Sequence, residues 1–116
     1  MNREKAEAHI LALARDNRIT VHWRRRAWKH FEAHPGTRMI FVGAPTTPIR
    51  YLAALHEMGH ILSPAALAAQ RGHQLTEEAA AWDWALDHAL PELMPNDFTE
   101  IRELVGMAWS SYLVVG

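Results

Sequence analysis

The sequence predicts an α+β fold, in which a small mixed or antiparallel sheet packs beside one helix, with about three further helices around them. Two observations predict this class. Two short runs rich in β-branched and aromatic residues indicate strands, and longer segments repeat apolar residues at helical spacing. The chain has 116 residues, enough for one hydrophobic core. We therefore expect a single domain over residues 1–116.

The first half of the chain is expected to supply one helix and both strands. Residues 3–16 repeat apolar side chains at helical spacing. The runs 19–23 (Ile-Thr-Val-His-Trp) and 38–42 (Arg-Met-Ile-Phe-Val) have the β-branched and aromatic residues that are typical of strands. The polar segment 24–36 ends in His-Pro-Gly, so we expect it to be mostly loop.

The second half is expected to be helical. A helix over about residues 47–62 has a threonine for its cap and Pro48 in its first turn. Residues 65–71 can add a short helix. A long helix over 76–90 begins at a threonine and carries two glutamates in its first turn, where the helix dipole favours acids. A final helix is expected over about 97–112.

Composition restricts the classes of function. The formal net charge of −1 argues against a general nucleic-acid binder, which usually carries a strong basic excess. The chain has no cysteine, so a transition-metal site must use His, Asp or Glu. The first residues do not form a signal peptide, and no stretch approaches the roughly 20 apolar residues of a membrane-spanning helix. We therefore expect a cytoplasmic protein that does not bind membranes, and the sequence leaves its oligomeric state open.

The main chemical motif is His56-Glu57-Met58-Gly59-His60, inside the helix expected over 47–62. Residues four apart on a helix project about 40° apart, one turn above the other. Both imidazoles can therefore reach one zinc ion at about 2.0–2.1 Å. Glu57 lies to the side and can accept a proton from a water in the open metal position. We predict His56 and His60 as metal ligands and Glu57 as the catalytic general base.

The two faces of this helix differ in composition. The face opposite His56 is an apolar stripe that is expected to face the core, and it consists of Tyr51, Ala54, Leu55, Met58, Ile61 and Leu62. The histidine face carries mostly small residues, namely Leu52, Ala53, Gly59 and Ser63. Gly59 lowers helix stability by about 1 kcal/mol relative to alanine. It therefore indicates that another element approaches closely there.

A catalytic zinc usually has a third protein ligand, and the next acids downstream are Glu77 and Glu78. Either glutamate also stabilises the start of its helix through the dipole alone. Glu78 shares its face with small residues and one tryptophan, which are Ala81, Trp82, Ala85 and Ala89. Small residues let this helix pack closely on the first. Glu77 is expected to point about 100° away, towards Trp84 and His88. We therefore predict Glu78 as the third ligand.

The two motifs together resemble a known family. His56-Glu-Met-Gly-His60-Ile-Leu, followed by Glu78-Ala-Ala-Ala81-Trp-Asp-Trp84-Ala85, is similar to the patterns H-E-x-G-H and E-x-x-A-x-x-[aromatic]-A. These are the patterns of the ImmA/IrrE-type metallopeptidases of the gluzincin group. The resemblance covers roughly residues 18–95. It implies a minimal zincin-like domain that binds Zn²⁺ through His56, His60 and Glu78 and uses Glu57 as general base.

The resemblance also implies a substrate. In this family a small sheet lies beside the active-site helix, and its edge strand holds the substrate extended, for which residues 38–42 are the natural candidate. Family members often belong to phages and mobile elements and cleave a helix-turn-helix repressor. A transcriptional repressor is therefore one candidate partner. A stand-alone peptidase that cleaves another protein fits equally well.

The residues leave alternatives open. The leading function is a zinc endopeptidase that hydrolyses peptide bonds of a protein substrate. The alternative is a catalytically silent metal-binding module that binds a protein partner, in which Glu57 has no chemical role. His73, Tyr51 and Tyr112 are candidate donors to the oxyanion of a hydrolytic reaction. The basic, aromatic segment 23–29 is best explained as a solvated loop whose tryptophans pack against the core.

Overall fold

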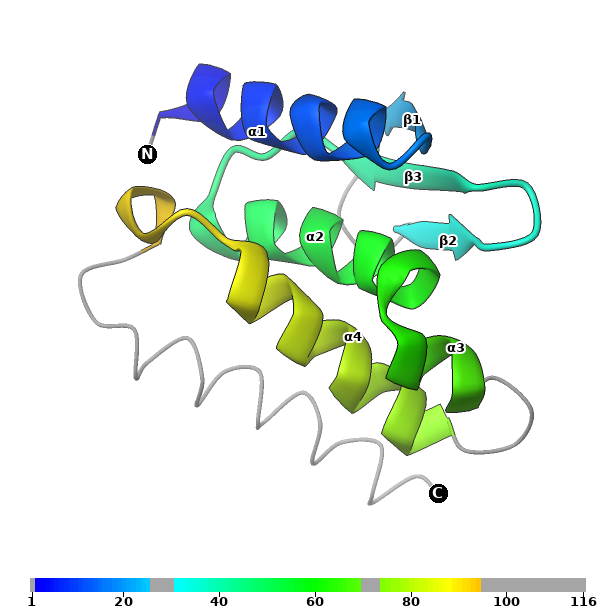
Figure 1. Ribbon diagram of the computed structural model, residues 1–116. Helices are drawn as coiled ribbons and strands as arrows, with labels where there is room; N and C mark the ends of the chain where they lie inside the picture. The colour runs from blue at the N-terminus through cyan, green and yellow to red at the C-terminus, as the bar shows by residue number, and fades with distance from the viewer. Residues whose placement is uncertain (1, 26–30, 70–73, 95–116) are drawn as a thin grey trace.

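Four α-helices and a three-stranded sheet make up the part of the chain that the structure describes, residues 2–25, 31–69 and 74–94 of a computed structural model (Figure 1). In chain order the elements are α1 (Arg3–Asp16), β1 (Thr20–Arg24), β2 (Glu32–His34), β3 (Met39–Gly43), α2 (Pro48–Leu62), α3 (Pro64–Ala69), α4 (Gln74–His88) and the 3-10 turn η2 (Pro91–Leu93). The α+β class is therefore confirmed. The helix expected over residues 97–112 lies outside the described residues.

The sheet is mixed, with β3 as its central strand. β1 pairs with β3 in parallel, and β2 pairs with β3 antiparallel, with Glu32 opposite Phe41 and His34 opposite Met39. The expectation of loop over residues 24–36 is wrong at β2. Half-buried Phe31 and Ala33 do alternate with exposed Glu32 and His34, but β2 has only three residues, fewer than the roughly four to eight by which an alternating strand is recognised in a sequence. Its pairing with β3 is a tertiary interaction.

Helix α2 is the central element of the fold. The Thr47 side chain accepts a hydrogen bond from the Arg50 N–H at 3.2 Å, and Pro48 occupies the first turn, as expected. In Figure 1, α1 and the sheet lie above α2, and α3 and α4 lie below it; α2 contacts all of these elements. Most of its residues are buried. Both its apolar stripe and its histidine face are therefore covered.

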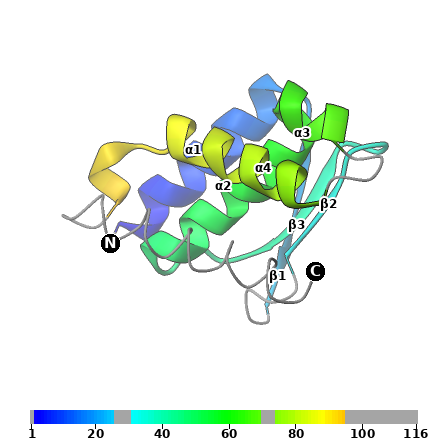
Figure 2. The ribbon, with the colours of Figure 1, turned by 90° about the horizontal axis from the view of Figure 1, so that it is seen from below.

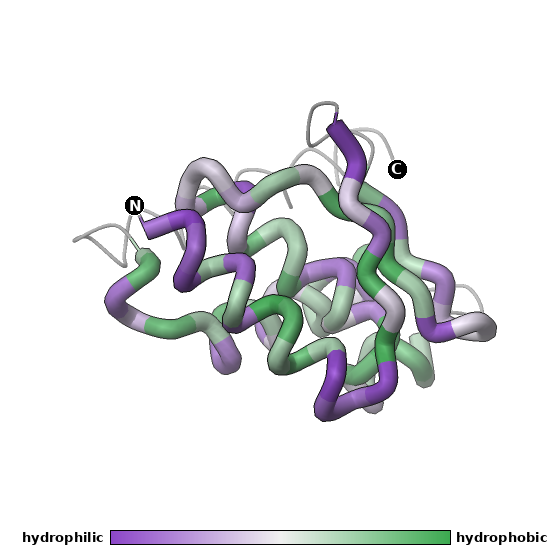
Figure 3. Tube along the Cα trace, turned by 90° about the horizontal axis from the view of Figure 1, so that it is seen from above, coloured by the Kyte–Doolittle hydropathy of each residue, from purple (hydrophilic) through white to green (hydrophobic). Residues whose placement is uncertain are grey.

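The helices gather on one side of the sheet, which Figure 2 shows nearly edge-on. Ile40 and Val42 of β3 are fully buried on that side and belong to one hydrophobic core with α1 and α2. α1 contributes its buried face, Ala6, Ile10 and Ala14. Along this helix in Figure 3, hydrophilic and hydrophobic segments alternate, as expected for a helix with one buried face.

The surface of the described part carries few large apolar side chains. Trp23, at the end of β1, is 41% exposed, so the expectation that it packs against the core is wrong. Among the elements that the structure describes, none of the helices combines the length and apolarity that crossing a membrane requires.

Candidate metal centre

Close packing of α2 and α4 brings the predicted site residues together. A Cβ atom on Gly59 would lie 2.5 Å from the carbonyl oxygen of Ala81 and 2.9 Å from its Cα atom. The close approach that Gly59 indicates is therefore made by the backbone of α4. Ala81 and Ala85 are fully buried, which confirms that the alanine face of α4 is the packed one. Glu78 lies on this face, one turn before Ala81 and Trp82.

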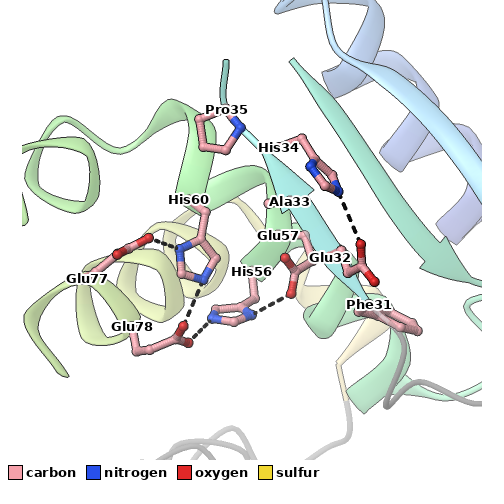
Figure 4. Close-up of a pocket in the computed structure, with 10 residues that line it drawn as sticks. All are labelled: Phe31, Glu32, Ala33, His34, Pro35, His56, Glu57, His60, Glu77 and Glu78. Atoms are coloured by element: carbon pink, nitrogen blue, oxygen red, sulfur yellow. Dashed lines mark hydrogen bonds and ion pairs between the residues drawn. The ribbon is translucent and has the colours of Figure 1, made fainter. Parts of the chain in front are cut away.

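Both imidazoles of the motif contact the same carboxylate of α4 (Figure 4). His56 Nε2 lies 2.7 Å from Glu78 Oε2, and His60 Nε2 lies 3.1 Å from Glu78 Oε1. The two rings are edge to face, with centroids 4.6 Å apart. All three side chains are nearly buried, at 10%, 10% and 14% exposure. The structure thus brings together the three residues that the sequence predicts as ligands.

The donor atoms suit a zinc ion. His56, Glu57 and His60 each offer one ligand atom, and these atoms lie within 4.8 Å of one another. Glu57 contacts Nδ1 of His56 at 3.5 Å, whereas Glu78 contacts the Nε2 atoms of both histidines at shorter distances. Ligand atoms around a tetrahedral zinc lie roughly 3.3 Å apart, close to the observed 2.7 and 3.1 Å. His56, Glu57 and His60 could therefore hold a metal ion, and the Glu78 carboxylate lies against both imidazoles.

Electrostatic attraction decides the ionisation of this cluster. Burial lowers the pKa of His56, but hydrogen bonds and charges from Glu57 and Glu78 raise it above its ordinary value. Burial also lowers the pKa of His60, but Glu78 above all, with Glu57 and Glu77, raises it to about 9. Burial raises the pKa of Glu78, but both imidazoles bring it down to about 2. The neighbouring charges therefore favour the protonated form of both imidazoles and the ionised form of Glu78.

Glu77 also belongs to the cluster, contrary to the sequence expectation. Its Oε1 lies 2.9 Å from Nδ1 of His60, and its side chain is 22% exposed. The helical phase between Glu77 and Glu78 is as expected, but it fixes only the direction of the Cα–Cβ bond. A glutamate side chain is long, and it leans towards the N-terminal end of its helix. Near the start of α4 this lean carries the carboxylate to His60, near the end of α2.

A cleft of about 580 Å³ opens onto the cluster. His56, Glu57 and His60 line one side together with Glu77 and Glu78, and the other side is the segment Phe31–Pro35, which contains β2 (Figure 4). The family resemblance implies that residues 38–42 form the edge strand, and this expectation is wrong. β3 is paired on both sides, since it lies between β1 and β2. The strand at the cleft is β2.

Trp82 has a contact that the sequence does not reveal. Its indole stacks on the imidazole of His56, with ring centroids 4.0 Å apart and planes inclined by 14°. The sequence places Trp82 on the face of Glu78 and assigns it no contact with a histidine. Its spacing of four residues from Glu78 was the available signal, because residues at this spacing lie on one helix face.

Tyr51 does not face the cluster. Its hydroxyl accepts a hydrogen bond from the Leu90 N–H at 2.9 Å and lies 2.6 Å from Nδ1 of His9. The oxygen can therefore donate its own proton to His9. This network joins α1, α2 and the segment after α4, so Tyr51 is not placed to donate to an oxyanion in the cleft. The other candidate donors, His73 and Tyr112, lie outside the described residues.

No family model, no curated protein and no solved structure matches this chain. A functional assignment therefore depends on the geometry of the cluster and on the two sequence motifs.

Proposed function

We propose that this chain is a zinc-dependent endopeptidase that hydrolyses peptide bonds of a protein substrate. One observation carries the proposal: the Glu78 carboxylate contacts the Nε2 atoms of both His56 and His60, and the Glu57 carboxylate lies next to His56 at the edge of a cleft. Glu57 is nearly buried and lines the cleft. Its contact with His56 lies within α2 and does not join two helices, whereas catalysis gives this carboxylate a chemical role.

The residues divide the chemistry between them. A bound zinc supplies Lewis acidity, which polarises a carbonyl and lowers the pKa of water. His56, His60 and Glu78 hold the ion. Glu57 accepts a proton from the water whose oxygen bonds to the scissile carbonyl carbon. As the carbon–nitrogen bond breaks, Glu57 returns this proton to the leaving amine.

The cleft suits an extended peptide. β2 borders it, and β2 has β3 as its sheet neighbour on one side within the described part of the chain. An extended segment can add to such a strand through main-chain hydrogen bonds, which hold a peptide without requiring a particular side chain. The substrate class that fits is therefore a protein with a segment that can become extended. A helix-turn-helix repressor is the candidate that the family resemblance of the two motifs implies.

Two measurements test the proposal. Elemental analysis of the purified protein should find about one zinc per chain, and His60→Ala should lose it. Glu57→Gln should keep the zinc and abolish cleavage of a quenched fluorescent peptide library, because the amide cannot accept the proton. Glu4→Gln on the exposed face of α1 is the matched control and should cleave like the parent. Equal cleavage by Glu57→Gln and Glu4→Gln would contradict the mechanism.

A second function has one observation in its favour. Both nitrogens of each imidazole contact a carboxylate: Glu57 and Glu78 at His56, Glu77 and Glu78 at His60. Such a network can hold α2 against α4 without any chemistry. A catalytically silent metal-binding module that binds a protein partner would use it in this way. For that module, Glu57→Gln would leave partner binding intact, while His56→Ala would unfold the domain.

A further inference from the structure

Helix α4 contacts the two motif histidines at more than the ligand atoms. Trp82 covers one face of the His56 ring, at a centroid distance of 4.0 Å. The ring of His60 meets the His56 ring edge on. Glu78 contacts the Nε2 atom of His56 at 2.7 Å. The imidazole of His56 can turn about its χ2 angle only if it leaves the indole face. Stacking therefore fixes the plane of this ring.

His60 is oriented in a different way. Glu77 Oε1 lies 2.9 Å from its Nδ1 atom, and Glu78 Oε1 lies 3.1 Å from its Nε2 atom. A carboxylate at Nδ1 holds a proton on that nitrogen, which leaves the Nε2 lone pair for a cation. Glu77 therefore sets both the orientation and the tautomer of the His60 ring.

We propose that Trp82 and Glu77 are positioning residues, one for each histidine, and that α4 thus supplies both the third ligand and the orientation of the other two. This inference rests on the proposed metal site. Glu77, Glu78 and Trp82 all belong to α4, and the contact of Ala81 with Gly59 fixes that helix against α2. A metal site needs its ligands within about 0.5 Å and 10–20° of the working geometry. Trp82 and Glu77 restrict the ring rotations that would exceed this tolerance.

The chain contains a matched control for each residue. Trp84 lies on the same helix and forms the same kind of stack, on His88, with centroids 3.9 Å apart and planes inclined by 16°. His88 is exposed and is not one of the cluster residues. Asp83 is an exposed acid on α4, so Asp83→Asn removes the same charge as Glu77→Gln. Trp84→Met and Asp83→Asn therefore show how much zinc affinity changes when an aromatic stack or a negative charge is removed from α4 away from the site.

The experiment measures zinc affinity by competition with a chromophoric chelator, and the visible absorption of the Co²⁺-substituted protein. Trp82→Met and Glu77→Gln should each bind zinc about 10–100-fold more weakly than the parent, with altered Co²⁺ bands. Trp84→Met and Asp83→Asn should stay within about twofold of the parent. Trp82→Phe keeps an aromatic face and should recover most of the affinity that Trp82→Met loses. A purely structural role for Trp82 would lower the stability of Trp82→Met but leave its Co²⁺ bands like those of Trp84→Met.

A second measurement applies to the parent, in case Trp82→Met does not fold. The ring protons of His56 should resonate upfield in the proton NMR spectrum, because they lie over the indole. An unshifted resonance would overturn the role of Trp82. Zinc affinities of Glu77→Gln and Trp82→Met equal to those of their controls would overturn the inference and leave the peptidase proposal standing. A parent that binds no zinc would remove both.

Discussion

Gly59→Ala tests the contact on which the whole site depends. The added methyl group would lie 2.5 Å from the carbonyl oxygen of Ala81, 2.9 Å from its Cα atom and 3.0 Å from its carbonyl carbon. All three are backbone atoms, so no side-chain rotation relieves the overlap and α4 must move. Forcing an extra methyl group into a packed interface costs about 1–3 kcal/mol. Because the obstacle is backbone, we expect the upper part of that range.

Helix propensity acts in the opposite direction. Alanine in the interior of α2 is favoured over glycine by about 1 kcal/mol. The net effect of Gly59→Ala is therefore a loss of about 1–2 kcal/mol in the free energy of unfolding. For a chain of this length that loss corresponds to a melting temperature lower by about 4–8 °C. Displacement of α4 also moves Glu78 away from His56 and His60, so zinc affinity should fall as well.

Thermal unfolding followed by circular dichroism, with and without zinc, measures both effects. Gly36→Ala is the matched control, because a Cβ atom there has no neighbour within 4 Å and should change neither stability nor zinc affinity. If Gly59→Ala instead raised the melting temperature, helix propensity would have prevailed. The close contact between α2 and α4, and with it the placement of Glu78, would then be wrong.

Three further predictions concern hydrogen bonding and protons. Tyr51→Phe should lower the free energy of unfolding by about 1–3 kcal/mol, because Leu90 N–H and His9 Nδ1 lose their partner; urea denaturation measures this loss, and zinc affinity should not change. Burial, more than any neighbouring charge, lowers the pKa of His9. The contribution of His9 to stability is therefore present above a pH of about 6.5 and is lost as the pH falls below that value. The free energy of unfolding of His9→Asn should depend less on pH in this range. The pKa of His60, raised to about 9, means that zinc must displace its proton at pH 7, so affinity should rise with pH up to about 9. Calorimetry in buffers of different ionisation enthalpy counts the released protons, and a count of zero would contradict the ion pair between His60 and Glu78.

The sequence predicts those parts of the site that depend on one helix at a time. The spacing of His56 and His60 follows from 3.6 residues per turn, and the apolar stripe opposite them is buried as expected, except for half-buried Leu62. Gly59 on α2 and the alanine face of α4 both indicate the same close contact between these two helices. The convergence of Glu78 on the two imidazoles could be anticipated for this reason, although about 20 residues separate them in the chain.

The parts that the sequence does not predict depend on tertiary contacts or on side-chain reach. β2 is too short for its alternation to be recognised, so its pairing with β3 is what identifies it as a strand. Glu77 and Trp82 both have ordinary explanations in a helix, as a dipole partner and as a core residue. Their contacts with His60 and His56 depend on where α2 lies relative to α4. Periodicity within one element does not encode that distance.

The ionisation of the cluster explains how it can accept a cation without reorganising. The pKa values of both imidazoles are raised and that of Glu78 is lowered, which favours a state with two protonated imidazoles and an ionised Glu78, whose total charge is +1 (two positive and one negative). If a divalent ion replaces the two protons, the imidazoles become neutral and the total is again +1. Placing net charge in a buried site is costly, and this exchange leaves that cost unchanged. Glu78 stays ionised in both states, so the attraction that holds α4 against α2 is present before and after the exchange. The ion pairs thus keep the ligands in place for a metal, and the proposed site needs no folding step to bind it.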